Sequence, residues 1–282
     1  MTVGIVGLGH IGGSLAKAYK AAGHTVYVYN RTESTARFAE LAGFADGMLD
    51  ETTIPECELI LIAIFPRAAI EYMEKIAPIV PKDTFVIDCC GTKRTVCKAG
   101  FELAEKYGYT YLGGHPMAGT KYSGFKSAKV DLFVDQPMVI IPPEYDNIEL
   151  YSKVKELLAP AGFGSISITT AERHDEIIAF TSQMAHVASS AYIKSPTALE
   201  HDGFSAGSYK DMTRVAWLNE NMWTGLLLEN RDNLVKELDC YIAELTKFRE
   251  ALDTNDPDTL CALLKQGREL KERIDGDAID KD

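Results

Sequence analysis

The first apolar run of the chain reads Thr2-Val3-Gly4-Ile5-Val6 and leads directly into Gly7-Leu8-Gly9-His10-Ile11-Gly12. Residues 14–22 follow with the apolar spacing and alanine content of a helix. A Gly-x-Gly-x-x-Gly motif between a strand and a helix points backbone amides and the positive helix end at a pyrophosphate. We therefore expect a dinucleotide-binding turn; the alternative is glycines that only close a tight strand-to-helix turn. The expected cofactor contacts are Gly7, Gly9, His10, Ile11 and Gly12.

The second strand, Thr25 to Tyr29, ends at Asn30-Arg31-Thr32, where a dinucleotide fold distinguishes its two nicotinamide cofactors. An acidic residue at this place would bind the ribose 2′-hydroxyl of NAD. The chain instead offers a guanidinium and small polar groups, which suit the 2′-phosphate of NADP. We expect NADP, with NAD possible, and contacts from Asn30, Arg31 and Thr32. The alternative is that Arg31 is only a solvated surface charge.

Strand and helix patterns alternate up to Ile168, and continuous apolar runs such as residues 59–64 are typical of buried parallel strands. We expect an α/β domain of the Rossmann type over residues 1–168, with Ile64 and Thr92 along the cofactor. After Thr169 the strand patterns stop. Residues 169–282 are expected to form an all-α domain, whose long helix from Glu220 to about Leu252 needs a partner face within the domain or on a second subunit.

The stretch Gly114-His115-Pro116-Met117-Ala118-Gly119-Thr120 is the expected centre of the chemistry. It follows a β-rich run at 109–113, which places His115 just beyond the carboxyl end of a strand. Open α/β sheets bind ligands at that edge. The proline and the glycines restrict and shape the backbone around the imidazole. Taken alone, this histidine is more often a capping or core residue of an ordinary loop.

Composition excludes several classes of partner. The chain has 282 residues, 46% of them hydrophobic, and a formal net charge of -12, so nucleic acid and anionic membranes would repel it. No apolar stretch reaches membrane-spanning length and no leader pattern opens the chain, so we expect a cytoplasmic protein. The six cysteines form no C-x-x-C pair, which indicates neither a zinc site nor a disulfide framework.

Two polar groupings mark the helical domain. Ser182 and His186 are four residues apart and share a helix face. Asp211 and Arg214 lie three apart, just after Gly207 in a glycine-rich turn. By itself, Arg214 would be read as a surface ion-pair partner.

Together these motifs resemble the prephenate and arogenate dehydrogenase family of tyrosine biosynthesis. The resemblance covers nearly the whole chain. It rests on the glycine turn, His-Pro-Met-Ala-Gly-Thr at 115–120, Ser-Gln-x-x-His at 182–186, Asp-x-Thr-Arg at 211–214, and Met222-Trp223 ahead of a long helix with Asn230-Arg231.

The resemblance implies a dinucleotide-binding domain followed by a helical domain that intertwines with its twin in a homodimer. It also implies that His115 is catalytic, that Ser182, His186, Gly207, Asp211 and Arg214 line the substrate pocket, and that Thr120 and Trp223 border it. The chain departs from the family at two places. Gly91 stands where the family has a serine that supports the histidine, and Lys121 follows Thr120 where the family is commonly acidic or uncharged.

The implied reaction is oxidative decarboxylation of prephenate to 4-hydroxyphenylpyruvate, with hydride transfer to the nicotinamide. Neutral imidazole suits a contact from His115 to the ring hydroxyl, and a guanidinium suits carboxylate binding by Arg214. Lys121 would repel the ammonium group of arogenate, which favours prephenate. The alternatives are an arogenate dehydrogenase, a β-hydroxyacid dehydrogenase, or a dinucleotide sensor without activity. β-Hydroxyacid dehydrogenases generally carry a lysine on the first long helix of their second domain, whereas residues 171–191 of this chain contain no lysine.

Overall fold

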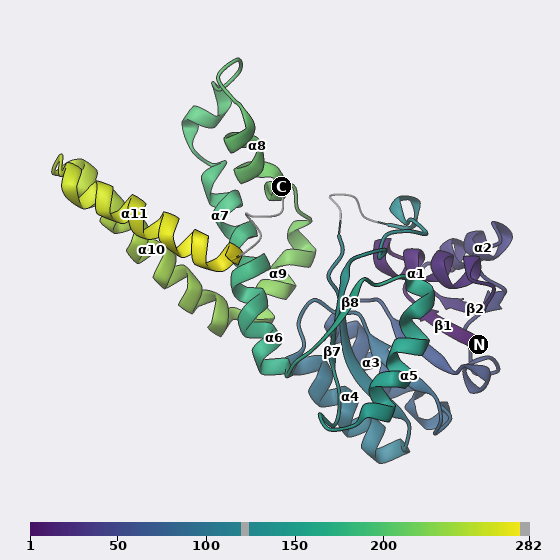
Figure 1. Cartoon of the computed structure of the whole chain (residues 1–282). Coiled ribbons are helices and arrows are strands. Elements are labelled where there is room, and N and C mark those ends of the chain that lie inside the picture. Colours follow the sequence, from purple (N-terminus) through teal and green to yellow (C-terminus); the bar gives the residue numbers. More distant parts are fainter. Residues whose placement is uncertain (120–123, 277–282) are drawn as a thin grey trace. The chain divides into compact units, whose positions relative to one another are not determined.

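The structure, a computed structural model, describes residues 1–119 and 124–276. Its centre is an eight-stranded sheet with the order β3-β2-β1-β4-β5-β6-β7-β8 (Figure 1). Neighbouring strands are parallel except β6 and β7, which are antiparallel. The strands are β1 (Thr2–Val6), β2 (Thr25–Tyr29), β3 (Gly47–Met48), β4 (Leu59–Ile62), β5 (Phe85–Asp88), β6 (Thr110–Pro116), β7 (Pro137–Ile141) and β8 (Ser165–Ile168).

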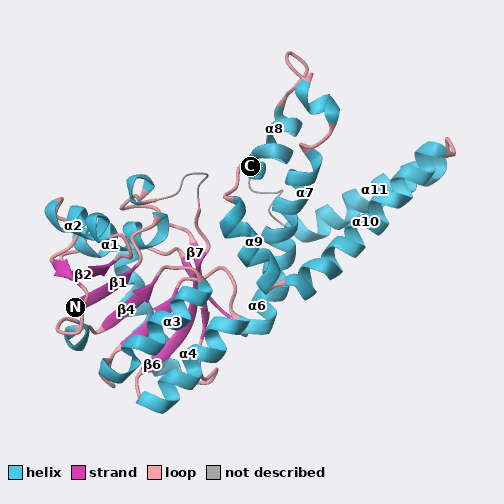
Figure 2. Cartoon of the chain, turned by 180° about the vertical axis from the view of Figure 1, so that it is seen from behind, coloured by secondary structure: helices cyan, strands magenta, loops and turns pink. Residues whose placement is uncertain are grey.

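Both faces of the sheet are covered, because successive side chains of a strand point to opposite sides. Val3 and Ile5 of β1 pack in the core formed with α1, α2 and α5, whereas Val6 packs in the core formed with α3 and α4. Figure 2 shows α3 and α4 on the near face of the sheet. This arrangement confirms the expected Rossmann-type architecture. The helices are α1 (His10–Ala21), α2 (Glu33–Leu41), α3 (Pro66–Ile76), α4 (Arg94–Tyr107) and α5 (Ile148–Leu158).

Only helices follow β8 in the described part of the chain, as expected. A π-helix at Ala179–Met184 joins α6 to α7, and π-helical turns inside α-helices are frequent at functional sites. The chain divides into two compact units, Met1–Arg231 and Asp232–Asp282. These helices are α6 (Ala171–Ile178), α7 (Ala185–Tyr192), α8 (Gly207–Thr213), α9 (Glu220–Glu229), α10 (Arg231–Asp253) and α11 (Pro257–Asp275).

Two expectations were wrong in detail. His115 lies within β6, because the strand continues past the end of its pairing with β5 and pairs antiparallel with β7, placing His115 opposite Val139. The long helix expected from Glu220 is interrupted at Asn230. The buried amide of Asn230 donates to the carbonyl oxygen of Asp175 at 2.7 Å and to the side-chain oxygen of Gln183 at 2.9 Å.

None of the helices in residues 1–119 and 124–276 combines the length and the apolar character that a membrane span requires.

Candidate active site

The turn between β1 and α1 has the shape that a pyrophosphate requires. Gly7 has a φ of +90°, and a Cβ on Gly12 would lie 1.8 Å from the carbonyl oxygen of Gly7, so only glycine allows this close approach. A Cβ on Gly9 would meet no described atom within 4 Å. Gly9 also supplies no side-chain cap to the first amides of α1, which leaves them available to an anion. These residues fit a dinucleotide.

The end of β2 is tied to the same turn. The side-chain oxygen of Asn30 accepts from the amide of Leu8 at 2.9 Å, and its nitrogen donates to the carbonyl oxygen of Thr32 at 3.0 Å. Arg31 and Thr32 are exposed. Asn30 therefore fixes the local backbone, while Arg31 and Thr32 present their side chains to solvent at the end of β2.

The other predicted cofactor contacts surround the turn. His10 Nδ1 lies 3.0 Å from Ser127 Oγ, whose hydroxyl donates to the carbonyl oxygen of Gly124 at 2.7 Å. The Ser127 oxygen is thus the acceptor and His10 Nδ1 the donor. Ile11 and Ile64 are half-buried, and Ile64 packs so closely on Gly7 that a Cβ there would come within 2.3 Å of it.

The backbone before His115 is held by a buried ion pair. The ammonium of Lys93 contacts the carboxylate of Asp88 and donates to the carbonyl oxygen of Gly114 at 2.6 Å. Tyr111 donates its hydroxyl to the other carboxylate oxygen of Asp88 at 2.6 Å. Burial alone would lower the pKa of Lys93, but Asp88, Cys90 and Cys97 together outweigh burial and raise that pKa. Because each buried charge has partners, the strand carrying His115 is firmly placed.

The imidazole of His115 is half-buried and bonded to a second histidine. Its Nδ1 lies 2.9 Å from Nε2 of His174, and Nδ1 of His174 lies 2.8 Å from a carboxylate oxygen of Asp175. Burial, then His174 and Lys93, hold the pKa of His115 well below its usual value. His115 is therefore neutral at neutral pH, which a group that accepts a proton from a hydroxyl requires.

Gly91 has no side chain to offer the His115 site. The adjacent Thr92 donates its hydroxyl to the carboxylate of Glu229 at 2.6 Å. A Cβ on Gly91 would make ordinary contact, at 3.6 Å, with Leu226. In this structure His174 is the partner of the His115 Nδ1, whereas Thr92 engages Glu229.

Several predicted substrate residues come together on the helices after β8. The ring of His186 stacks on Trp223 with centroids 3.8 Å apart, and its Nδ1 donates to the carbonyl oxygen of Ser182 at 2.9 Å. Burial, together with the charge of Arg214, lowers the pKa of His186, although the Ser182 hydrogen bond acts in the opposite direction.

Gly207 and Asp211 lie on α8, and both are exposed, as is Arg214. The 3-10 turn that carries Arg214 follows α8 directly and packs against α7, the helix of His186. Thr120 and Lys121 lie outside the described residues.

Comparison with known proteins assigns both parts of the chain. Residues 15–166 match the nucleotide-binding domain of prephenate dehydrogenase, and residues 170–266 match its dimerization domain. This chain belongs to the prephenate dehydrogenase family. As a member of that family it is a dehydrogenase that uses a nicotinamide dinucleotide.

Three relatives illustrate the family. Cyclohexadienyl dehydrogenase of Zymomonas mobilis is 29% identical over 95% of this chain and 94% of its own. Arogenate dehydrogenase from Synechocystis is 26% identical, with a TM-score of 0.80 over 97% of this chain and 100% of that one. Prephenate dehydrogenase from A. aeolicus, solved with hydroxyphenyl propionate and NAD+, shares the fold at 24% identity, with a TM-score of 0.82 over 98% of each chain. Because their names differ in substrate, family membership alone does not select one.

Sequence reasoning missed His174 and Asp175. They lie on α6 at helical spacing from Ala171 and Ile178, and all four side chains are buried. Two adjacent polar residues on an otherwise apolar helix face are a signal of a buried polar network, which could have identified this pair.

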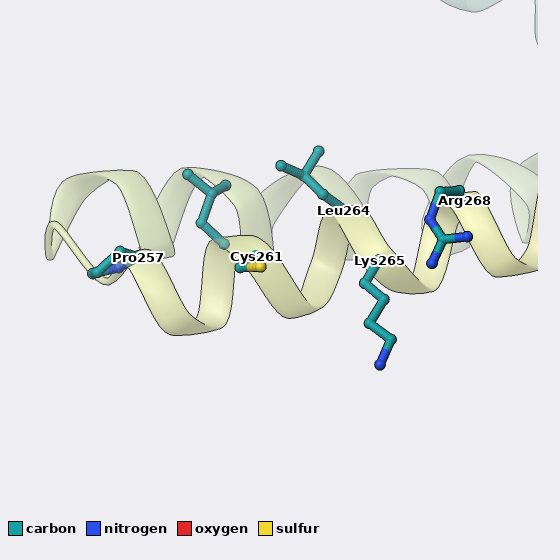
Figure 3. Close-up of a pocket in the computed structure, with 6 residues that line it drawn as sticks. Pro257, Cys261, Leu264, Lys265 and Arg268 are labelled. Atoms are coloured by element: carbon teal, nitrogen blue, oxygen red, sulfur yellow. The ribbon is translucent and has the colours of Figure 1, made fainter.

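A separate groove lies along α11 (Figure 3). Its volume is about 460 Å³, and its lining comes from one helix only, including Cys261, Leu264 and Arg268. It contains none of the predicted site residues, so it is not the candidate active site.

Proposed function

We propose that this family member converts prephenate to 4-hydroxyphenylpyruvate. The glycine turn after β1 would hold the nicotinamide dinucleotide, which would supply the acceptor for the hydride on the ring carbon that carries the hydroxyl. The hydroxyl proton passes to His115 as the carbinol carbon becomes a carbonyl. The electron pair of the breaking C–CO2 bond then moves into the ring, which becomes aromatic, and the proton returns from His115 to the ring oxygen to give the phenol. Since aromaticity drives the reaction, the protein mainly has to orient the substrate and accept the proton.

The observation that carries this proposal is the position of His115 on β6, where its imidazole is hydrogen-bonded to His174 and lies in the same sheet as β1, the strand that leads into the glycine turn. Burial lowers the pKa of this imidazole and so favours its neutral form. A hydroxyl proton needs an acceptor at the reacting carbon, and a positioned neutral histidine supplies one at cellular pH. Asp88 and Lys93 support this role by fixing the backbone at Gly114.

The carboxylates of the substrate require a cationic or donor-rich pocket. We assign that pocket to Arg214, with Ser182, His186, Gly207 and Asp211 lining it beside Arg214. Thr120 and Trp223 are assigned to its border, and Lys121 is a further substrate contact. A planar guanidinium holds a carboxylate through two parallel hydrogen bonds. The stacking of His186 on Trp223 supports a preformed pocket wall.

The choice of prephenate over arogenate rests on charge. Prephenate brings a keto-acid carboxylate where arogenate carries an ammonium group. Lys121, next to the His115 stretch, would attract the former and repel the latter. A single exposed contact of this kind is worth about 1 kcal/mol, so we expect a preference rather than exclusion. Arogenate dehydrogenase is the second candidate function.

The preferred cofactor follows from the end of β2. Arg31 and Thr32 are exposed there, and no acidic residue occupies positions 30–32. A guanidinium beside the ribose favours the 2′-phosphate of NADP. We therefore place NADP ahead of NAD, with Thr92 and Ile64 near the rest of the cofactor.

The second compact unit supports a homodimer. Its helices α10 and α11 expose apolar side chains that include Val235, Ile242, Leu245 and Leu264. Such residues need a covering surface, and the match to a dimerization domain favours a second copy. We place the boundary between the two functional domains at residues 168–169, where β8 ends. Light scattering on the purified protein tests the dimer, and a monomer would refute it.

The experiment for the substrate mixes the protein with NADP and either prephenate or arogenate and follows the reduced cofactor. We expect a higher kcat/KM for prephenate and 4-hydroxyphenylpyruvate as product. Lys121→Glu should move the ratio toward arogenate, whereas the matched control Lys126→Glu, on an exposed neighbour, should not. An arogenate preference in the wild type refutes the substrate assignment, and no turnover of either substrate refutes the function.

A further inference from the structure

The hydrogen bonds around His115 form a chain that ends on a buried carboxylate. Asp175 accepts from the backbone amides of Lys93 and Arg94 at 2.7 and 3.0 Å, and from Nε of Arg94 at 3.3 Å. Burial alone would raise the pKa of Asp175, but hydrogen bonds from His174 and these amides outweigh it and lower that pKa. Asp175 is therefore ionised, and an ionised carboxylate can only accept hydrogen bonds.

The carboxylate determines which nitrogen of each imidazole carries the proton. Since Asp175 only accepts, Nδ1 of His174 must be the donor in their 2.8 Å contact. Burial lowers the pKa of His174 despite the carboxylate, so this ring is neutral and its Nε2 is an acceptor. Nδ1 of His115 must then donate across the 2.9 Å contact. The neutral ring of His115 is left with an unprotonated Nε2.

We propose that His174 and Asp175 are positioning residues that hold His115 in the tautomer whose Nε2 accepts the substrate hydroxyl proton. This inference rests on the proposed role of His115. When the O–H bond of the substrate breaks, the proton forms a new N–H bond at Nε2 of His115. The resulting positive charge faces the acceptor nitrogen of His174 and, behind it, the carboxylate of Asp175, which stabilises it.

The pair is built as a fixed support. His174 and Asp175 are 2% and 1% exposed, so neither can be reoriented by solvent. Arg94 also donates to Asn230 at 3.1 Å, and Asn230 donates to the carbonyl oxygen of Asp175. The amides at the start of α4 therefore fix the carboxylate, and the carboxylate fixes both rings. With glycine at position 91, the support for the imidazole comes from α6.

The first test reads the tautomer without any turnover. Side-chain ¹⁵N NMR of the wild-type protein, with histidines assigned through His115→Asn and His174→Gln, should show both His115 and His174 protonated at Nδ1. An Nε2-protonated His115 in the wild type would overturn the proposal, whether or not the enzyme acts on prephenate.

The second test separates positioning from simple stability. Asp175→Asn should lower kcat by roughly a hundredfold or more, because an amide can donate to His174 and reverse both tautomers. His174→Gln, whose amide oxygen can still accept from His115, should retain more activity than His174→Leu. The KM for cofactor should not change in any of them. The control is Tyr19→Phe, which removes a buried hydroxyl that donates to the carbonyl oxygen of Leu157. It loses a buried hydrogen bond far from His115, so its kcat should not change.

The dependence of kcat/KM on pH distinguishes a positioning role of His174 and Asp175 from a purely structural one. Among the residues that the structure describes, the charged groups acting on the two rings are Asp88, Lys93 and Asp175, and Arg94 contacts Asp175. Removing the carboxylate of Asp175 disfavours the protonated pair, so the acid limb of kcat/KM should move to lower pH in Asp175→Asn. If Asp175→Asn and His174→Gln lower only the melting temperature, with kcat within about threefold of wild type and an unmoved profile, the pair is merely structural. Because the wild type is assayed alongside, failure of the proposed reaction itself is recognised separately.

Discussion

The imidazole of His186 stacks on the indole of Trp223, with ring centroids 3.8 Å apart and planes inclined by 30°. Its Nδ1 is engaged by the carbonyl oxygen of Ser182, so the ring can present only Nε2 to a ligand. Stacked aromatic pairs contribute about 0.5–1.5 kcal/mol beyond area burial. We expect Trp223→Leu to raise the KM for substrate about two- to tenfold and Trp223→Phe to raise it less. Equal effects of both variants in steady-state kinetics would show that the stacking is not what matters.

Arg214 is expected to act on substrate binding rather than on turnover. A carboxylate is present in the ground state and in the transition state alike, so Arg214→Ala should mainly raise the KM for substrate, by roughly tenfold. Arg214→Lys keeps the charge but not the bidentate geometry, so its KM for substrate should lie between those of the wild type and Arg214→Ala. Arg173→Ala, on an exposed arginine paired with Glu176, serves as the control. An unchanged KM for substrate in Arg214→Ala would show that Arg214 is only a surface charge.

Arg31 is expected to distinguish the two cofactors. If its guanidinium binds the 2′-phosphate, Arg31→Ala should weaken NADP binding about fivefold or more while leaving NAD nearly untouched. The control is Arg37→Ala, on an exposed arginine that pairs with Glu33 and Glu40. Isothermal titration of both cofactors measures this directly. Equal losses for NADP and NAD, or a wild-type preference for NAD, would contradict the assignment.

The buried histidines make stability depend on pH. Burial lowers the pKa values of His115, His174 and His186 in the folded chain, whereas unfolded histidines titrate near 6.5. Below about pH 6.5 the unfolded chain therefore binds more protons than the folded one, and acidification favours unfolding. We expect the melting temperature to fall as pH decreases from 7.5 to about 5.5. In His174→Gln the melting temperature should fall less steeply with decreasing pH than in the wild type. The same slope in both proteins would contradict a neutral His174 in the folded chain.

The parts of the molecule that depend on local patterns could be predicted from the sequence. The β1–α1 turn needs glycines at fixed spacing, and buried parallel strands are continuous apolar runs, so both are visible in the chain itself. The antiparallel extension of β6 through His115 depends on its pairing with β7, which no local pattern encodes.

The support of His115 depends on contacts between distant segments in the same way. His174 and Asp175 form the support of His115 only when α6 packs against the start of α4. The helix break at Asn230 likewise depends on the contact of its amide with Asp175. The place of His174 and Asp175 on an apolar helix face signals a buried polar network, but it does not say which distant groups complete that network.

The most direct test of the central claim is the turnover number of His115→Asn with prephenate and NADP. Asparagine cannot take the hydroxyl proton, so kcat should fall by about two to four orders of magnitude, the usual size of a general-base contribution, while cofactor affinity barely changes. A variant that keeps near-normal turnover would contradict the assignment of the hydroxyl proton to His115.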